Sequence, residues 1–341
     1  MKRTTTPTQI FNKYKVLLYV ILFSTLLFSI YKFLSPNHPQ SKSTVKVCIS
    51  QIINHPALDA TRKGIVDGLQ QAGYVAGKNM VLETGIAQGK VDTSVQIAQK
   101  FVGGKPDVIV GISTPSAQTA ALAAKATQIP VVFSSVTYPV QAKLVNSIEK
   151  PGGHVTGVSN FTEIRDHFLF FRKLMPNLKR LGLIYNPGEA NSAIMVEKSQ
   201  QTGKELGIEI VLSPAMKTSD VASATLKLVG AVDAVFINND NTALGAFDII
   251  VKIADRNNLP VFVSDTDMIE QGGLAALGSN QYELGRQTAE MVVRILGGAK
   301  SADIPVEFSK IMETKINVAV ARKLGITLPP DLMKEAVLVE K

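Results

Sequence analysis

Short apolar runs alternate with segments of helical periodicity along most of the chain after residue 44. The apolar runs that are typical of buried strands are 45–49, 80–85, 108–111, 131–134, 181–185, 209–213, 234–237, 261–263 and 274–277. The segments of helical periodicity lie near residues 58–72, 92–103, 116–126, 190–206, 219–229, 241–257 and 282–297. Buried parallel strands have continuous apolar sequences, and a crossover helix follows each of them. The alternation therefore predicts βαβ units and an α/β fold with parallel sheets.

The alternation divides into two series. The first ends near residues 157–159, a helical stretch with Arg165, Phe168, Phe171 and Leu174 follows, and the second opens at residues 180–185. Two successive open α/β halves account for the length better than one large sheet, so we expect two doubly wound parallel-sheet lobes joined by a hinge. Ligands bind at the carboxyl ends of strands in such sheets. Facing lobes would therefore hold a ligand in the cleft between them and close over it.

The first 44 residues have a different pattern. Lys13 and Lys15 precede an apolar run over residues 16–31, and the Pro-, Ser- and Lys-rich residues 35–44 predict a tether. The run is short for a spanning helix, which needs about 20 apolar residues, yet no small-residue cleavage site follows it. A cleaved signal peptide and a retained membrane anchor both stay open. Either one predicts that the rest of the chain is exported to the periplasm or to the extracytoplasmic face of the membrane.

The positive charge of the chain belongs to this N-terminal segment. The formal net charge is +8. Residues 1–45 carry no acidic side chain and these six basic ones: Lys2, Arg3, Lys13, Lys15, Lys32 and Lys42. The remaining body therefore has a net charge of only +2, which is a poor electrostatic match for nucleic acid. The single cysteine, Cys48, cannot form an internal disulfide and is expected to be a small buried residue of the first strand.

In the first series, the loops after the strands carry candidate ligand-binding residues. His55 and Pro56 follow the first strand, either as a ligand contact or as a turn. Ser113 and Thr114 follow the third strand, and Pro115 suits the first turn of a helix there. The amino terminus of that helix favours an anion such as a ligand carboxylate, although simple helix capping is the alternative. Further candidates in these loops are Ser116, Ala117, Gln118, Ser135, Thr137 and Tyr138.

In the second series, the corresponding loops add acidic and amide side chains. Glu189 stands among Asn186, Asn191 and Ser192 at the start of a helix. Asn239, Asp240 and Asp265 follow later strands. Capping explains some of these residues but not the whole set. An acidic side chain opposite the predicted carboxylate site would suit a zwitterion, and Asp240 and Glu189 are the first choices for its ammonium group.

Motifs that would indicate an enzyme or a cofactor are missing. The sequence has no phosphate-binding G-x-x-x-x-G-K-[ST], no dinucleotide-binding G-x-G-x-x-G and no nucleophile elbow G-x-S-x-G. Its four histidines, His38, His55, His154 and His167, have no paired metal-ligand spacing. We therefore expect no cofactor and no metal, and an enzyme of the hydrolase class ranks below a binding protein.

Six stretches together resemble one known family. In order they are 55–60 (His-Pro-Ala-Leu-Asp-Ala), 114–118 (Thr-Pro-Ser-Ala-Gln), 155–159 (Val-Thr-Gly-Val-Ser), 185–192 (Tyr-Asn-Pro-Gly-Glu-Ala-Asn-Ser), 240–242 (Asp-Asn-Thr) and 282–289 (Tyr-Glu-Leu-Gly-Arg-Gln-Thr-Ala). They resemble the substrate-binding proteins of ABC transporters whose better-known members bind tryptophan or tyrosine. The resemblance covers about residues 45–330. Each stretch is modest alone, but six in register are specific.

This resemblance implies a type 1 periplasmic-binding fold. Residues 45–158 and 283–310 would form lobe one, and residues 159–282 and 311–341 would form lobe two. It also implies that Thr114, Ala117 and Gln118 meet the ligand carboxylate. Polar contacts from lobe two would come from Asn186, Glu189, Asn191, Ser192 and Asp240.

The chain departs from the family pattern at three places. Tyr138 stands where the family often has Asp, Asn238-Asn239 stands where it often has Pro-Thr, and no lipoprotein cysteine is evident. We expect an extracytoplasmic solute-binding protein of an ABC importer that binds a small ligand, with an aromatic amino acid favoured and a permease as partner. The alternative is a membrane-tethered sensor with the same cleft and a receptor partner.

Overall fold

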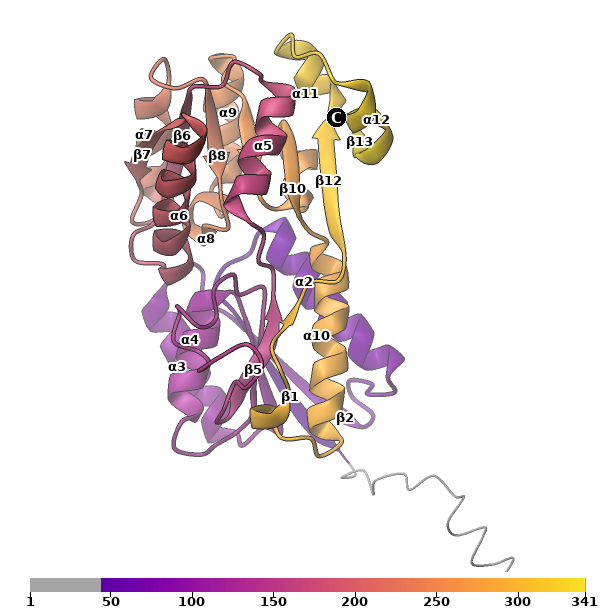
Figure 1. Cartoon of the computed structure of the whole chain (residues 1–341). Helices are drawn as coiled ribbons and strands as arrows, with labels where there is room; N and C mark the ends of the chain where they lie inside the picture. The colour runs from indigo at the N-terminus through magenta and orange to yellow at the C-terminus, as the bar shows by residue number, and fades with distance from the viewer. Residues whose placement is uncertain (1–43, 341) are drawn as a thin grey trace, which may run out of the picture. The chain divides into compact units, whose positions relative to one another are not determined.

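A computed structural model describes residues 44–340, which form two α/β lobes (Figure 1). The predicted signal or anchor segment and most of the tether lie outside these residues. Among the residues described, none of the helices has both the length and the apolar character that crossing a membrane requires. Each lobe has its own sheet with helices packed around it, so the predicted doubly wound fold class is confirmed.

Lobe one contains a six-stranded sheet whose strands are all parallel. Their order is β11-β5-β4-β3-β1-β2. The bounds are β1 (Val45–Gln51), β2 (Met80–Ile86), β3 (Val108–Ile112), β4 (Val131–Ser134), β5 (Val155–Ser159) and β11 (Glu307–Phe308). Because the strands are parallel, their carboxyl ends share one edge of the sheet. That edge presents the polar loops that the sequence singled out.

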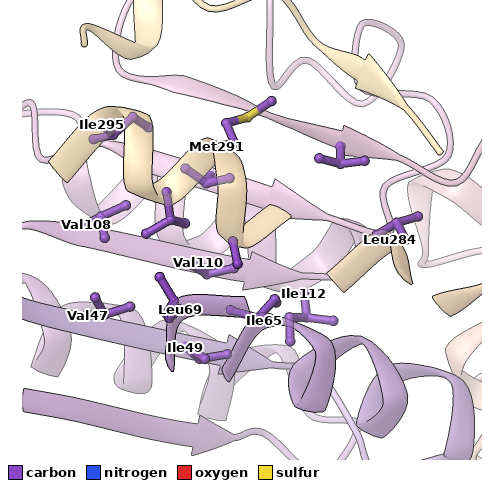
Figure 2. Packing of buried hydrophobic residues seen from close by; sticks show 14 of the residues in the cluster. Val47, Ile49, Ile65, Leu69, Val108, Val110, Ile112, Leu284, Met291 and Ile295 are labelled. Carbon is purple, nitrogen blue, oxygen red and sulfur yellow. The ribbon is translucent and has the colours of Figure 1, made fainter. Parts of the chain in front are cut away.

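Four main helices accompany this sheet: α2 (Pro56–Gln71), α3 (Val91–Gly103), α4 (Thr114–Ala124) and α10 (Gln281–Leu296). A short 3-10 helix, η3 (Ser301–Asp303), follows α10. Figure 2 shows strand residues such as Val47 and Val110 in one cluster with Leu69 of α2 and Met291 of α10. The buried apolar strands thus form one core with two helices that are far apart in the sequence.

Glycines allow α2 and α10 to pack closely. A Cβ atom on Gly64 would lie 2.0 Å from the carbonyl oxygen of Tyr282, and one on Gly285 would lie 2.1 Å from that of Thr61. Real side chains do not tolerate such distances to a neighbouring backbone. The reciprocal approach fixes α10 against α2 and therefore fixes the start of α10, Gln281, beside the cleft.

Lobe two contains a seven-stranded sheet in the order β13-β12-β10-β9-β8-β6-β7. The bounds are β6 (Arg180–Tyr185), β7 (Glu209–Pro214), β8 (Ala234–Ile237), β9 (Val261–Val263), β10 (Ala275–Ser279), β12 (Met312–Asn317) and β13 (Val337–Val339). β12 runs antiparallel to β10, and the other neighbouring strands are parallel. Lobe two is therefore a mainly parallel sheet in which β12 and β13, at one edge, run opposite to the other five strands.

The helices of lobe two are α5 (Ile164–Leu174), α6 (Ala190–Leu206), α7 (Val221–Leu228), α8 (Asn241–Leu244), α9 (Phe247–Arg256), α11 (Val318–Lys323) and α12 (Pro330–Glu335). Two 3-10 helices, η1 (Thr218–Asp220) and η2 (Thr266–Gln271), complete the lobe. Its core contains stacked rings: Phe171 lies 4.1 Å from Phe262 and 5.0 Å from Phe236, measured between ring centroids. These rings hold α5 against the middle of the sheet.

The chain crosses between the lobes three times, between β5 and α5, between β10 and α10, and between β11 and β12. The crossing segments are residues 159–164, 279–281 and 308–312, near the predicted lobe boundaries. Several crossings side by side are the arrangement that permits hinge closure. Figure 1 shows lobe two above these crossings and lobe one below them.

The expected single helix over residues 241–257 is wrong in detail. The structure has two helices, α8 and α9, separated at Gly245 and Ala246. Ile53 of lobe one approaches Gly245 so closely that a Cβ atom there would lie 2.4 Å from Ile53 Cδ1. A packing contact with the other lobe therefore accompanies the break, which periodicity along the chain does not reveal. The sequence pattern also did not predict β12, β13, α11 or α12.

Candidate functional site

Buried polar atoms without a hydrogen-bond partner gather where the two sheets face each other. Within residues 44–340, those at strand ends and helix starts of the cleft are Ser50 Oγ, Gln51 Oε1, Ser113 Oγ, Ser116 Oγ, Asn191 Oδ1 and both side-chain atoms of Asn238. Buried polar groups in proteins are nearly always hydrogen-bonded. A concentration of unpartnered ones on both sides of a cleft is therefore the mark of a polar ligand site.

The start of α4 offers several hydrogen-bond donors to the cleft. Ser113 follows β3 and precedes α4. Its φ is 77°, a backbone conformation that a serine rarely adopts. Its hydroxyl group and that of Ser116 are buried. The N–H groups of Thr114 and Ser116 lie in the first turn, where a helix offers them no carbonyl partner. Two hydroxyls and two N–H groups at the positive end of a helix suit a carboxylate.

The other residues predicted to contact the ligand carboxylate form hydrogen bonds within lobe one or are buried there. The Ala117 N–H donates to Ser113 O at 3.0 Å. Gln118 Nε2 donates to Ala142 O at 3.0 Å and so fixes the loop after β4. Thr114 is buried at the first position of α4. The structure therefore brings Ser113, Thr114 and Ser116 to the cleft and gives Ala117 and Gln118 partners within lobe one.

The end of β1 lies beside this helix start. Gln51 is fully buried, and its Nε2 donates to Ile53 O at 2.7 Å and to Asp59 Oδ1 at 2.9 Å. Its Oε1 has no hydrogen-bond partner. His55 precedes α2 and is buried. Burial lowers the pKa of His55 to about 4, although the side chain of Asn241 opposes the shift. His55 is therefore a neutral ring close to lobe two at neutral pH, with no hydrogen bond of ordinary geometry.

Glu189 caps a helix of its own lobe. Its Oε1 accepts from Thr242 N at 3.1 Å and from Thr242 Oγ1 at 2.9 Å, and its Oε2 accepts from the backbone and the side-chain N–H groups of Asn241. Burial and the nearby Asp240 raise the pKa of Glu189 to about 7. All four bonds fix α8, so both carboxylate oxygens already have protein partners.

Asp240 has the same kind of structural surroundings. Its Oδ1 accepts from Ala243 N at 2.7 Å, and its Oδ2 accepts from Ser192 Oγ at 2.6 Å and from Asn186 N. The side chain is completely buried, and burial raises its pKa. These bonds cap α8 and join it to the loop after β6. The expectation that Asp240 and Glu189 are the first choices for a ligand ammonium group therefore needs revision.

The amide side chains of the lobe-two loops differ in whether the protein already bonds their polar atoms. Asn186 Nδ2 donates to Thr242 Oγ1 at 2.8 Å, and Asn186 Oδ1 accepts from the Gly188 N–H at 2.8 Å. Asn191 donates from Nδ2 to Asn239 O at 2.6 Å, but its Oδ1 has no partner. Asn238, at the end of β8, is fully buried with neither side-chain atom bonded. Asn191 and Asn238 are therefore the lobe-two amides that remain free for a ligand.

Asp265 lies at the end of β9, where a hydrogen bond connects it to lobe one. Gln281 Nε2 donates to Asp265 Oδ1 at 2.7 Å, and Gln281 Oε1 accepts from Ser135 Oγ at 2.7 Å and from Thr61 Oγ1 at 3.0 Å. Burial and the neighbouring Asp267 raise the pKa of Asp265 to about 7. Among the described residues no partner is found for Asp265 Oδ2. Lobe one therefore orients this carboxylate through a bond to one of its two oxygens.

Thr137 and Asn239 bond to each other across the cleft. Asn239 Nδ2 of lobe two donates to Thr137 Oγ1 of lobe one at 3.1 Å. Thr137 is 2% exposed, so little water reaches the bond. These two predicted ligand contacts thus have a protein partner in each other.

Tyr138 lies on the hinge side of the cleft. Its ring packs edge-on against Phe161 at 5.5 Å between centroids, and Phe161 packs against Phe308 at 6.1 Å. The three rings line a pocket of about 410 Å³. Burial, followed by the charge of Glu163, raises the pKa of Tyr138 to about 12. Tyr138 therefore packs against the crossing segments.

A second pocket, of about 450 Å³, is lined by loops of both lobes. Lobe one contributes residues 88–91 to its walls, and lobe two contributes residues 216–219. Within residues 44–340, no three His, Cys, Asp or Glu side chains lie together so that they could hold a metal ion. The site is therefore built from hydroxyls, amides, backbone N–H groups and one oriented carboxylate.

Sequence reasoning missed Ser50, Gln51 and Asn238 as candidate site residues. Each is polar at the end of an otherwise apolar strand, which is a signal that the sequence does carry. What the sequence does not carry is which hydrogen-bonding groups remain unpartnered after folding.

Comparison with known proteins agrees with this architecture. The family model described as ABC transporter substrate binding protein matches residues 46–340. The chain belongs to this family. A tyrosine-binding protein from Clostridioides difficile (strain R20291) is 37% identical over 276 residues, which cover 81% of this chain and 79% of that protein. As an ABC transporter substrate-binding protein, the chain has a binding role, and its family is one of solute-binding proteins rather than enzymes.

Solved structures of relatives have the same fold as this substrate-binding protein. A conserved domain protein from Vibrio cholerae is 41% identical with a TM-score of 0.85, and an ABC domain in complex with L-Trp from Streptococcus pneumoniae is 34% identical with a TM-score of 0.83. A ligand-free, open substrate-binding protein from Clostridium difficile, also 34% identical, has a TM-score of 0.66. Each comparison covers 87% of this chain and 100% of the other. At equal identity, the lobes match the L-Trp complex better than the open protein, and the predicted type 1 fold is confirmed.

Proposed function

We propose that this substrate-binding protein captures an aromatic amino acid in the cleft between its lobes. The observation that carries the proposal is the set of buried, unpartnered polar atoms at facing strand ends of the two sheets. A zwitterion offers both a donor and an acceptor group to such a set. Two relatives that are 34–37% identical are a tyrosine-binding protein and an L-Trp complex, which supports an aromatic side chain on the ligand.

The start of α4 receives the carboxylate of the ligand in this proposal. Ser113 and Ser116 supply hydroxyl groups, and the first turn supplies N–H groups. The helix is 11 residues long and contributes the positive end of its dipole. All of these donors are uncharged, so they would bind the carboxylate through hydrogen bonds and the helix dipole, without a positively charged side chain.

Asp265 receives the ammonium group, in place of Glu189 and Asp240. It is 3% exposed, oriented by Gln281 and has one oxygen without a partner among the described residues. Glu189 and Asp240 support the site indirectly because they fix α8 and the start of α6, which carries Asn191. Removing a partner from a buried charge is costly, so a ligand ammonium group beside Asp265 is stabilising for both.

A thermal-shift screen of residues 44–341 against the common amino acids tests this function. A ligand at about 100 times its dissociation constant stabilises the folded state by about 2.7 kcal/mol. We expect L-tyrosine or L-tryptophan to raise the melting temperature and glucose to leave it unchanged. Ser116→Ala should reduce the shift, while Ser223→Ala, at an exposed position of α7, should not. Equal responses to all amino acids and to glucose would refute the proposal.

We propose further that the ligand passes to a dedicated ABC permease and that residues 1–44 act as an export signal or an anchor. Substrate-binding proteins of ABC importers work outside the cytoplasm and deliver small molecules to a permease. The basic and apolar pattern of residues 13–32 supports export of the body. Protease treatment of intact spheroplasts tests the orientation: an exported body is degraded, and a cytoplasmic one is protected.

A further inference from the structure

The bond between Asn239 and Thr137 joins the two lobes directly. Asn239 follows β8 in lobe two, and Thr137 follows β4 in lobe one. We propose that this bond is a latch that closes the lobes for part of the time without any ligand, and that Asn239 is a positioning residue rather than a ligand contact. The proposal goes beyond the binding function and rests on it only in that closure encloses the ligand.

Lobe two fixes both the amide oxygen and the backbone carbonyl of Asn239. Asn239 Oδ1 accepts a hydrogen bond from Ser264 Oγ at the end of β9. Its backbone carbonyl accepts from Asn191 Nδ2 at 2.6 Å. Because the amide oxygen is engaged by Ser264, the NH2 group must point toward lobe one. Both supporting residues belong to lobe two and move with it.

Thr137 is fixed in a complementary way. Its hydroxyl donates to Asn160 Oδ1 at 3.1 Å, and its backbone carbonyl accepts from Ser159 Oγ at 3.2 Å. With the hydroxyl proton directed at Asn160, an oxygen lone pair is left for Asn239. Asn160 lies in the crossing segment between β5 and α5, at the pivot between the lobes.

These bonds form one directed chain in which each hydroxyl or amide group donates once. Ser264 donates to Asn239, Asn239 donates to Thr137, and Thr137 donates to Asn160. Of these three bonds, opening of the lobes breaks only the middle one, since the others stay within lobe two or between lobe one and the pivot. Both ends are thus pre-oriented, and closing requires no rearrangement of either side chain.

The expected size of the effect follows from the usual net contribution of one hydrogen bond, which corresponds to about a two- to tenfold change in an equilibrium constant. Loss of the latch should lower the ratio of closed to open protein by this factor. If the ligand binds productively only to closed lobes, apparent affinity falls in proportion to the closed fraction. A ligand contact behaves differently, because its loss leaves the ligand-free protein unchanged.

Pulsed electron paramagnetic resonance on the full-length protein without amino acids tests the latch. Spin labels at Lys90→Cys in lobe one and Ser219→Cys in lobe two report on the two walls of the second pocket described above. Both native residues are exposed. The native Cys48 is buried. We expect a short-distance population in the labelled parent protein that Asn239→Ala and Thr137→Val each reduce about two- to tenfold. The double variant should show no greater loss than the single variants, since both remove one bond.

Asn257→Ala is the matched control, because Asn257 is an exposed lobe-two asparagine whose side chain donates to Ile253 O of α9, within the same lobe. It should leave the distances unchanged. Identical distance distributions for the parent and both latch variants would overturn the proposal. This outcome is separate from the ligand question: if added L-tyrosine and L-tryptophan fail to shorten the distances in the parent protein, the proposed function fails while the ligand-free comparison still stands.

Discussion

Ser192 Oγ donates a hydrogen bond of 2.6 Å to Asp240 Oδ2, and this contact ties the start of α6 to the cap of α8. Asp240 is completely buried and has bonds to Asn186 N and Ala243 N as well. An acidic residue beside a ligand cleft can therefore have a wholly structural role. What separates it from Asp265 is the number of its oxygens that the protein already uses.

Asp240→Asn should destabilise lobe two, because an amide NH2 group would then face the Asn186 N–H and the Ser192 hydroxyl. We expect a loss of about 1–3 kcal/mol in the free energy of unfolding, measured by urea titration. Ser192→Ala should cost a similar amount, because it removes a bond to a carboxylate. Ser223→Ala, which removes an exposed hydroxyl bonded to Asp220 O, is the control. Unchanged unfolding in Asp240→Asn with complete loss of ligand binding would instead indicate a ligand contact.

Asp265 should make binding depend on pH. Its pKa is raised to about 7 in the described structure, and the ionised form is the one that attracts an ammonium group. Affinity should be constant above pH 7 and fall by up to about tenfold per pH unit below it, because protonation then competes with the ligand. Calorimetric titrations at pH 5.5, 6.5 and 8 measure this slope. Asp265→Asn should bind weakly and without the slope; a flat profile in the parent protein would count against the assignment.

His167 should weaken the protein in acid. It is fully buried, with ring centroids of Phe236 and Phe171 at 5.3 and 6.0 Å, and burial lowers its pKa to about 3. A base with a lowered folded-state pKa has no effect above its unfolded pKa of about 6.5, and stability is lost as pH falls from there toward 3. At pH 5 the cost is about 2 kcal/mol.

Replacing His167 by Phe removes this titration. His167→Phe should therefore gain more stability over the parent at pH 5 than at pH 8, in urea melts at both values. Burial lowers the pKa of His55 as well, to about 4, so the parent should keep part of its acid sensitivity through that ring. An equal gain at both pH values would show that His167 does not resist protonation.

The glycine contact between α2 and α10 should be intolerant of any side chain. A Cβ at Gly64 or Gly285 would lie about 2 Å from the backbone of the other helix, and overpacking of this kind costs about 3 kcal/mol. Gly64→Ala and Gly285→Ala should both lower the melting temperature. Gly103→Ala in α3, where a Cβ has no atom within 4 Å, should be neutral or slightly stabilising. Equal melting temperatures for Gly64→Ala and Gly103→Ala would contradict the packing described.

The fold could be predicted from the sequence because buried parallel strands are local apolar runs. The runs at 108–111 and 261–263 coincide with β3 and β9 almost residue for residue. Elements that depend on distant packing were harder: α8 and α9 separate where Ile53 of the other lobe approaches Gly245. Residues 1–43, with the signal or anchor, lie outside the described structure.

The loops of the site were predictable, but the roles of their side chains were not. Residue type and strand-end position pointed equally to Glu189, Asp240 and Asp265. Only folding decides that Thr242 and Asn241 use the oxygens of Glu189, whereas Gln281 uses just one oxygen of Asp265. Thr137 and Asn239 were likewise recognised as cleft residues, yet each lies opposite the other, and no property of the sequence alone pairs positions 102 residues apart.

The central claim is that the cleft binds an aromatic amino acid. Isothermal titration calorimetry of residues 44–341 with L-tyrosine, L-tryptophan, L-alanine and L-lysine at pH 8 tests it most directly. We predict saturable binding of one aromatic amino acid per chain, with L-alanine and L-lysine at least about a hundredfold weaker, since one well-buried aromatic ring is worth several kcal/mol. No heat with either aromatic amino acid, or equal affinity for L-alanine, would contradict the claim.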